Sequence, residues 1–170
     1  YAYVGVWGFG LIRIDSETGS QKFYQDDFKH VEWMDINSAD KMINEMEWID
    51  DKKILIATGD GLRVFDIEEE KYIKGYFRTK NKNQGMNWPT DRYWIRNFEF
   101  IDENSLWITA KNGIVYKANL VDETLENFTE KTNLSSSEAY EILLDKVNNQ
   151  LWLNIQNIGI DILDINSNEV

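Results

Sequence analysis

One pattern recurs four times along the 170 residues and restricts the possible folds more than any other feature. Each copy consists of a short β-prone run, a turn that ends in glycine and a second β-prone run. The glycines that anchor the four copies are Gly10, Gly61, Gly113 and Gly159. They lie about 50 residues apart, which is within the range of known repeat architectures. The sequence therefore predicts a row of similar units, each as large as one supersecondary motif.

Each copy of the pattern predicts a β-hairpin, because two β-prone runs flank a short turn that contains glycine. Glycine at the end of such a turn adopts a positive φ without a Cβ clash. A further strand precedes each of the last three hairpins, and a more polar strand, suited to an outer edge, follows each of the first three. The expected strands are 3–6, 11–15, 21–24, 42–49, 55–58, 62–66, 72–77, 95–101, 107–110, 114–117, 125–129, 139–144, 152–155 and 160–164.

The repeating unit is thus a sheet of four antiparallel strands. This period and strand number are typical of β-propeller blades, and no long stretch has the 3.6-residue period of a helical repeat. We predict an all-β fold of about 3.5 blades, with blades at 1–24, 42–77, 95–129 and 139–170. The first blade lacks its first strand and the last blade its fourth. We therefore expect flanking blades to complete a larger propeller of seven or eight blades, with a homodimer as the alternative.

Small residues recur in the second strand of the first three units. Gly5, Ala57 and Thr109 take the same place in the pattern. A small side chain lets two packed sheets approach closely, so we expect contacts between neighbouring sheets there. Aromatic residues make up 14% of the chain and include seven Trp, which supply large apolar side chains for the core.

Charge and composition exclude several classes of function. The chain has 30 acidic and 18 basic residues and a net charge of −12, which argues against nucleic acid as a partner because phosphate needs a basic face. There is no Cys, so disulfides and thiolate metal sites are excluded. His30 is the only histidine, which excludes a histidine-rich zinc site. The segment 35–40 lacks the glycine and the final Glu of a calcium loop. We expect neither a metal nor a cofactor.

Individual copies of the repeat share characteristic residues. The fourth copy contains Leu151-Trp152-Leu153, then Gly159-Ile160 and Asp164, and the second contains Gly61-Leu62 and Phe65-Asp66. This pattern resembles the two-component regulator propeller repeat, and the resemblance extends over nearly the whole chain. The third copy departs from it, because Lys117-Ala118 stands where the family has an aromatic residue followed by Asp.

The resemblance implies a biological context. Propellers of this family form the periplasmic or extracellular sensor part of hybrid two-component histidine kinases, where they are thought to sense carbohydrates. It implies flanking blades and kinase or regulator domains of the same parent chain as partners. It also implies a role in signal transduction and transcription regulation for that parent.

The connections at 25–41 and 78–93 are long for a compact domain, and long loops on a rigid scaffold often bind ligands. In a propeller these linkers share a face with the turns of the repeated hairpins. Exposed Trp and Tyr rings stack on sugar rings, and Arg donates hydrogen bonds; the alternative is that the aromatic side chains cover the core. The candidate ligand-binding residues are Trp7, Phe9, Trp33, Trp88, Arg92, Tyr93 and Trp94.

Three functions are compatible with this sequence. The first is a non-enzymatic sensor propeller that binds an oligosaccharide and signals to a histidine kinase. The second is a secreted propeller enzyme, either a polysaccharide lyase or a hydrolase, since one fold supports many functions. The third is a scaffold for protein interactions. No catalytic residue is predicted, because neither a Ser-His-Asp set nor a carboxylate pair stands out from the sequence.

Overall fold

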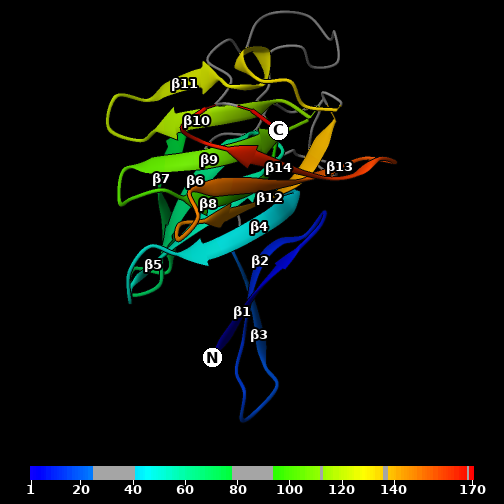
Figure 1. Cartoon of the computed structure of the whole chain (residues 1–170). Coiled ribbons are helices and arrows are strands. Elements are labelled where there is room, and N and C mark those ends of the chain that lie inside the picture. The colour runs from blue at the N-terminus through cyan, green and yellow to red at the C-terminus, as the bar shows by residue number, and fades with distance from the viewer. Residues whose placement is uncertain (25–40, 78–93, 112, 136–137, 168) are drawn as a thin grey trace, which may run out of the picture. The chain divides into compact units, whose positions relative to one another are not determined.

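The computed structural model describes residues 1–24, 41–77, 94–111, 113–135, 138–167 and 169–170. Within these residues, fourteen strands form four antiparallel sheets, and the chain divides into two compact units, 1–94 and 95–170 (Figure 1). In every sheet, strands that follow one another in the chain are also neighbours in the sheet. This up-and-down order is the one that the repeated hairpins predict.

The first unit contains two sheets. The first sheet consists of β1 (Ala2–Val6), β2 (Gly10–Ile14) and β3 (Gln21–Tyr24). The second sheet consists of β4 (Ile43–Trp48), β5 (Lys53–Thr58), β6 (Gly61–Asp66) and β7 (Lys71–Tyr76).

The second unit also contains one four-stranded and one three-stranded sheet, in the opposite order along the chain, and a short 3-10 helix. The third sheet consists of β8 (Ile95–Phe100), β9 (Ser105–Ala110), β10 (Val115–Asn119) and β11 (Thr124–Asn127), followed by η3 (Thr129–Lys131). The fourth sheet consists of β12 (Ala139–Asp145), β13 (Gln150–Ile155) and β14 (Gly159–Asp164).

The predicted strands are confirmed, and their ends agree within one or two residues. The eleventh strand is one of those that differ by two residues at one end. That strand was expected to reach Thr129 but ends at Asn127. The Thr129 hydroxyl accepts a hydrogen bond from the backbone N–H of Val115 at 2.8 Å, and the chain turns into η3 there. The ring of the intervening Phe128 packs on Trp107, with 4.7 Å between centroids. Burial of that ring and the bond to Thr129 thus end the strand early.

The departure of the third repeat from the family pattern has a structural cause. On β9 and β10, Thr109 pairs with Val115, whereas the equivalent pair on β5 and β6 is Ala57 and Leu62. The turn between β9 and β10 is therefore one residue longer. As a result, Ala118-Asn119, and not Lys117-Ala118, takes the place that Phe65-Asp66 has in the second repeat.

The turn after the third strand of each repeat is held by the same hydrogen bonds. One side-chain Oδ1 accepts from the backbone N–H groups two and three residues later, at distances between 2.8 and 3.0 Å. Side chains of Asp and Asn favour such turns because they replace a backbone acceptor. The four residues that do this are Asp15, Asp66, Asn119 and Asp164.

The core of the first unit lies between its two sheets. It contains aliphatic and aromatic side chains from β2, β3, β4, β5 and β6, and it closes tightly around Gly5 on β1. A Cβ atom at Gly5 would overlap Cγ2 of Ile43 and lie 3.2 Å from the Met46 sulfur. The prediction that a small residue allows close approach is thus confirmed at this position. The buried core residues are Leu11, Tyr24, Ile43, Ile54, Ile56 and Phe65.

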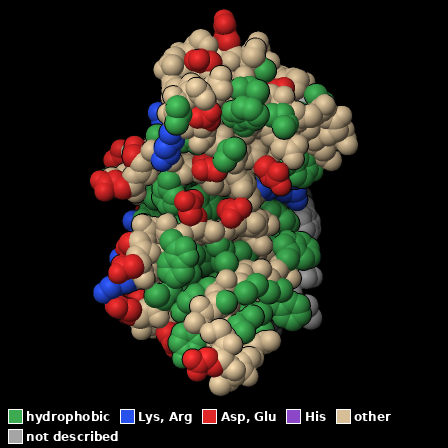
Figure 2. Space-filling view, turned by 60° about the horizontal axis from the view of Figure 1, so that its bottom comes forward, with side chains coloured by type: hydrophobic (Ala, Val, Ile, Leu, Met, Phe, Trp, Pro, Cys, Tyr) green, Lys and Arg blue, Asp and Glu red, His purple; other side chains and the backbone are tan. Residues whose placement is uncertain are grey.

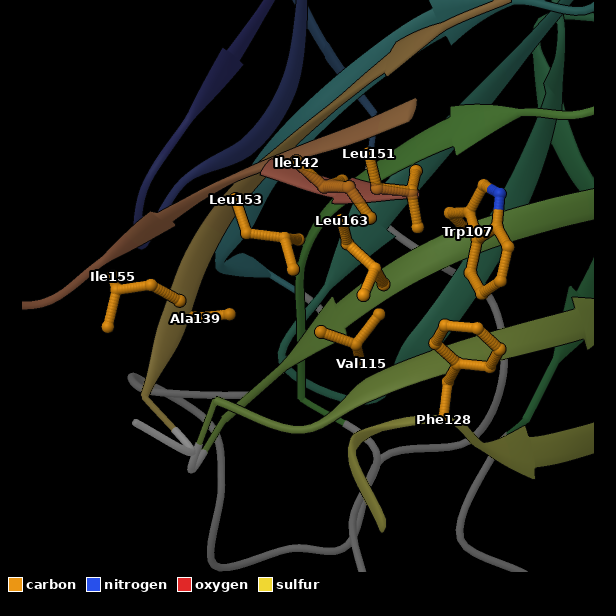
Figure 3. Close-up of a cluster of buried hydrophobic side chains, with 9 residues drawn as sticks. All are labelled: Trp107, Val115, Phe128, Ala139, Ile142, Leu151, Leu153, Ile155 and Leu163. Atoms are coloured by element: carbon orange, nitrogen blue, oxygen red, sulfur yellow. The ribbon is translucent and has the colours of Figure 1, made fainter. Parts of the chain in front are cut away.

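The core of the second unit lies between its two sheets in the same way (Figure 3). Trp107 and Phe128 contribute the aromatic rings at one end of this core, and β12, β13 and β14 contribute aliphatic side chains that extend from them to Ile155 at the other end. Thr109 is fully buried at the same junction, and its hydroxyl donates to the backbone oxygen of Tyr140 at 3.0 Å. A small side chain therefore also marks this junction, where it forms a hydrogen bond between the sheets.

The surface combines acidic and hydrophobic side chains. On the face seen in Figure 2, Asp and Glu side chains are spread among exposed hydrophobic ones. Several of the exposed hydrophobic residues are aromatic and large enough to contact a ligand or another protein. They include Trp7, Phe9, Phe23, Trp48 and Trp152. Across the described ranges, no helix has the length and apolar character needed to cross a membrane.

Candidate functional site

The most prominent candidate site is the turn between β1 and β2, which holds two exposed aromatic side chains. Trp7 and Phe9 are 61% and 63% exposed. The turn is short because Val6 pairs directly with Gly10, and the backbone N–H of Phe9 donates to the Val6 oxygen at 3.0 Å. Gly8 has a φ of 85°, which a residue with a Cβ rarely adopts. We call residues 7–9 the aromatic turn.

The aromatic turn is also tied to the neighbouring sheet. The backbone N–H of Gly8 donates to the Lys41 oxygen at 2.8 Å, just before β4 begins. In the second unit the corresponding bond has the opposite direction, because the backbone N–H of Ala139 at the start of β12 donates to the Gly113 oxygen at 3.3 Å. In each unit, therefore, the hairpin turn of one sheet lies beside the start of the first strand of the next. Two backbone hydrogen bonds thus anchor the turn that bears the two exposed rings.

A β-bulge interrupts the first strand of each of the last three sheets at this same end. The pairing shifts between Ile43 and Glu45, between Ile95 and Asn97 and between Ala139 and Glu141. Bulges of this kind redirect a side chain and are frequent near functional sites. The residues that occupy the three bulges are Asn44, Arg96 and Tyr140.

Sequence reasoning did not single out these bulge residues. A signal was nevertheless present, because core-facing hydrophobic residues are three residues apart instead of two. The pairs are Ile43 and the partly buried Met46, Ile95 and Phe98, and Ala139 and Ile142. In a regular strand, side chains on one face are separated by two residues, so a spacing of three indicates an extra residue.

The structure describes three of the seven predicted ligand-binding residues. Trp7 and Phe9 lie together on the aromatic turn, and Trp94 immediately precedes β8 and is half-buried. Their role in binding stays a prediction. The other four, Trp33, Trp88, Arg92 and Tyr93, lie outside the described residues, as do His30 and the segment 35–40.

Buried polar side chains at the junctions have structural partners. Arg63 donates to the backbone oxygens of Asp60 and Leu62 at 2.8 and 3.0 Å. Asp161 accepts from the backbone N–H of Ser135 at 2.7 Å and from its hydroxyl at 2.8 Å. The Arg63 bonds hold the turn between β5 and β6, and the Asp161 bonds tie the loop at Ser135 to the edge strand β14. In the part of the chain that the structure describes, no group of three or more His, Asp and Glu side chains is arranged to hold a metal ion.

The fold is similar to that of known extracellular domains. No family model matches the chain, and no curated protein matches it. The extracellular domain of a putative hybrid two-component system from B. thetaiotaomicron has a TM-score of 0.67 at 21% identity, over 98% of this chain and 19% of that one. A second such domain from that organism has a TM-score of 0.54 at 19% identity, over 98% and 26%. A computationally designed protein has a TM-score of 0.57 at 11% identity, over 96% and 84%.

Strand order, repeat length and likeness in fold agree on one architecture. The four sheets are β-propeller blades. The chain spans 19% and 26% of the lengths of these two extracellular domains. At these sequence identities the likeness is one of fold. The predicted fold class is confirmed, and the ligand and the partners need arguments of their own.

Proposed function

We propose that the chain is part of an extracytoplasmic sensor propeller of a two-component regulatory system. Its fold is that of extracellular domains of putative hybrid two-component systems, and its repeats resemble the two-component regulator propeller repeat. Both observations support a periplasmic or extracellular location and a signalling role without catalysis. The parent chain would then supply flanking blades and a kinase or regulator domain.

The proposed ligand is a neutral oligosaccharide, and the observation that carries it is the aromatic turn. Trp7 and Phe9 are exposed by more than half of their surface, yet two backbone hydrogen bonds fix the turn that bears them. Aromatic rings offer a flat apolar face, which suits the C–H face of a pyranose ring. A ligand shifts a signalling equilibrium only if it binds one arrangement better than the other. Contact across the Gly8–Lys41 junction gives the ligand a way to favour one arrangement of two blades.

Calorimetric titration with a panel of neutral oligosaccharides tests this proposal. We expect one member of the panel to bind, and Trp7→Ala or Phe9→Ala to weaken its binding by about tenfold or more, which corresponds to about 1.4 kcal/mol. Trp48→Ala is the matched control, because Trp48 is 51% exposed at the far end of β4. No binding to any oligosaccharide, or equal losses in Trp7→Ala and Trp48→Ala, would contradict the proposal.

A further inference from the structure

The first sheet ends at a strand that has the composition of an interior strand. β1 is an edge strand, because the order in its sheet is β1-β2-β3. Its sequence, Ala-Tyr-Val-Gly-Val, contains no charged residue. Charged residues on an edge strand hinder pairing with a further strand. All the other edge strands of the described sheets include at least one charged residue, and these are β3, β4, β7, β8, β11, β12 and β14. Within these sheets, β1 alone lacks this protection.

The other three sheets show which kind of strand lies beside the equivalent of β1. In the repeat, β5, β9 and β13 correspond to β1, and each of them pairs antiparallel with the first strand of its sheet. We call these first strands, β4, β8 and β12, the inner strands. β9 and β13, like β1, contain no charged residue. The first sheet has no inner strand among the described residues, so the edge of β1 is the place where the other sheets have one.

The backbone groups of Tyr3 and Gly5 point to this free edge. The N–H of Asp15 donates to the Ser20 oxygen at 2.9 Å, so hydrogen-bonded pairs between β2 and β3 follow at every second residue from there. They include the β2 residues opposite Tyr3 and Gly5. Because those residues bond to β3, the bonds between β1 and β2 are formed by the alternate residues of β1. Tyr3 and Gly5 therefore direct their N–H and C=O groups away from β2, where no described strand pairs with them.

The inner strands share a pattern that a partner for this edge would need. An apolar residue is followed by two residues and then by a second apolar residue, as in Ile95 and Phe98, because of the bulge. β8 and β12 also pack against each other. The guanidinium carbon of Arg96 lies 3.7 Å from the centroid of the Tyr140 ring, so the two bulge residues meet. A strand beside β1 would pack on β4 in the same way, with its bulge residue next to Asn44.

We propose that the free edge of β1 binds an extended segment of the parent chain that has the inner-strand pattern. The segment pairs antiparallel to β1 and forms main-chain hydrogen bonds with Tyr3 and Gly5. Its apolar residue after the bulge lies beside Val4, which is 37% exposed, as Phe98 lies beside Ile108. A second copy of this chain is not the donor, because its described inner strands are already paired within their own sheets. The choice of donor rests on the parent propeller proposed above, whereas the pairing rests on β1 and does not depend on the oligosaccharide.

Amide hydrogen exchange, followed by NMR on the 170-residue chain, tests this pairing. The probe is a synthetic peptide with the sequence of residues 94–101, which contains β8. We expect a saturating concentration of this peptide to slow the exchange of the Tyr3 and Gly5 amides by about tenfold or more, because their free N–H groups become hydrogen-bonded.

Two peptides with a methyl group on one backbone nitrogen provide the matched controls. In β8, the N–H of Glu99 belongs to the ladder with β9, since Ile101 donates to the Ser105 oxygen at 2.9 Å and bonded pairs alternate. A methyl group on the Glu99 nitrogen should weaken binding by about tenfold or more, because it removes a ladder donor. A methyl group on the Phe98 nitrogen should leave binding unchanged, because that N–H points away from the acceptor strand.

Several outcomes would overturn the proposal. Unchanged exchange of the Tyr3 and Gly5 amides would show that the edge accepts no strand. Equal weakening by the two methyl groups would show that the peptide binds without a ladder of hydrogen bonds. If light scattering showed a dimer of the chain that the peptide dissociates, the donor would be a second copy and not the parent chain. Oligosaccharide binding is measured separately at the aromatic turn, so its failure does not affect this test.

Discussion

Trp107 and Trp152 occupy the same position in the third and fourth sheets, but their surroundings differ. Trp107 pairs across the hairpin with Lys117, and Trp152 pairs with Ile162. Trp107 is 1% exposed because the fourth sheet packs on its face, whereas Trp152 is 37% exposed. The repeat thus determines where a tryptophan lies on a blade, and the neighbouring blade determines whether it is buried.

The largest expected effect compares these two tryptophans directly. Trp107→Ala should lower the free energy of unfolding by about 3–5 kcal/mol, because it removes a fully buried ring and leaves a cavity beside Phe128. Trp152→Ala should lower it by about 1 kcal/mol or less, since the ring is partly in water. Urea unfolding followed by circular dichroism measures both values. Equal losses would break the comparison and mean that the Trp152 face is also packed in solution.

A second comparison concerns the position two residues after that of Trp107 and Trp152. Gly5 occupies this position in the first blade. Gly5→Ala should destabilise the protein by about 1–3 kcal/mol, because the new methyl group overlaps Ile43. The loss should shrink in the background of Ile43→Ala, which removes the overlapping atom. A double-mutant cycle of urea unfolding measures this coupling. The same loss in both backgrounds would show that Gly5 acts through backbone conformation and not through packing.

Thr109 and Asn154 occupy the same position in the third and fourth blades and extend the second comparison to them. Thr109→Val should lower the free energy of unfolding by about 1–2 kcal/mol, because the Tyr140 oxygen loses its buried donor without a change in side-chain shape. Asn154→Ala should change it by about 0.5 kcal/mol or less, because Asn154 is exposed. Thermal unfolding of both variants tests the order of these effects. A larger loss for Asn154→Ala would reverse it.

The smallest effect is on the acid dependence of stability. Backbone hydrogen bonds, above all from Thr18 in the first repeat and from Ser167 in the fourth, lower the pKa values of Asp15 and Asp164 below the ordinary value of 3.8. A lowered pKa in the folded protein means that the stabilisation is complete above pH 3.8 and is lost as the pH falls through the folded value. The third repeat has Asn119 at this position, which does not titrate.

Exchanging the two residue types sharpens this difference. Asp15→Asn should make the unfolding midpoint less sensitive to pH below about 4, and Asn119→Asp should make it more sensitive. Urea unfolding at a series of pH values gives both slopes. Parallel slopes for wild type and both variants would mean that these turns do not contribute to acid unfolding.

The sequence predicted the strands well because their signals are local. A hairpin turn with glycine and a β-prone run on each side carries its own information, so β5, β6, β13 and β14 lie where they were expected. The longer turn before Val115 was missed, since one inserted residue moves Asn119 without changing the composition of the repeat. Such an insertion is visible only when strand pairing is known.

The candidate site was less predictable because it depends on contacts between sheets. Trp7 and Phe9 were found from the sequence, since a turn with two aromatic residues is conspicuous. The contact between Arg96 and Tyr140 joins two strands more than 40 residues apart, and each of the two residues occupies a β-bulge. The sequence around Arg96 does not indicate that a tyrosine ring will lie against its guanidinium group, and the sequence around Tyr140 does not indicate an arginine.

The packing around Gly5 brings two blades close together. A glycine lies where β1 meets β4, whereas aromatic rings fill the space between the sheets nearer to β3, where Tyr24 and Phe65 lie 4.8 Å apart between centroids. The two sheets are therefore close at the inner side and are held apart at the outer side, so that they diverge as two segments of a circle do. An angle that recurs from blade to blade fixes how many blades a closed ring accommodates. The volume of a few side chains, distributed from the centre outward, thus determines the size of the ring that such blades build.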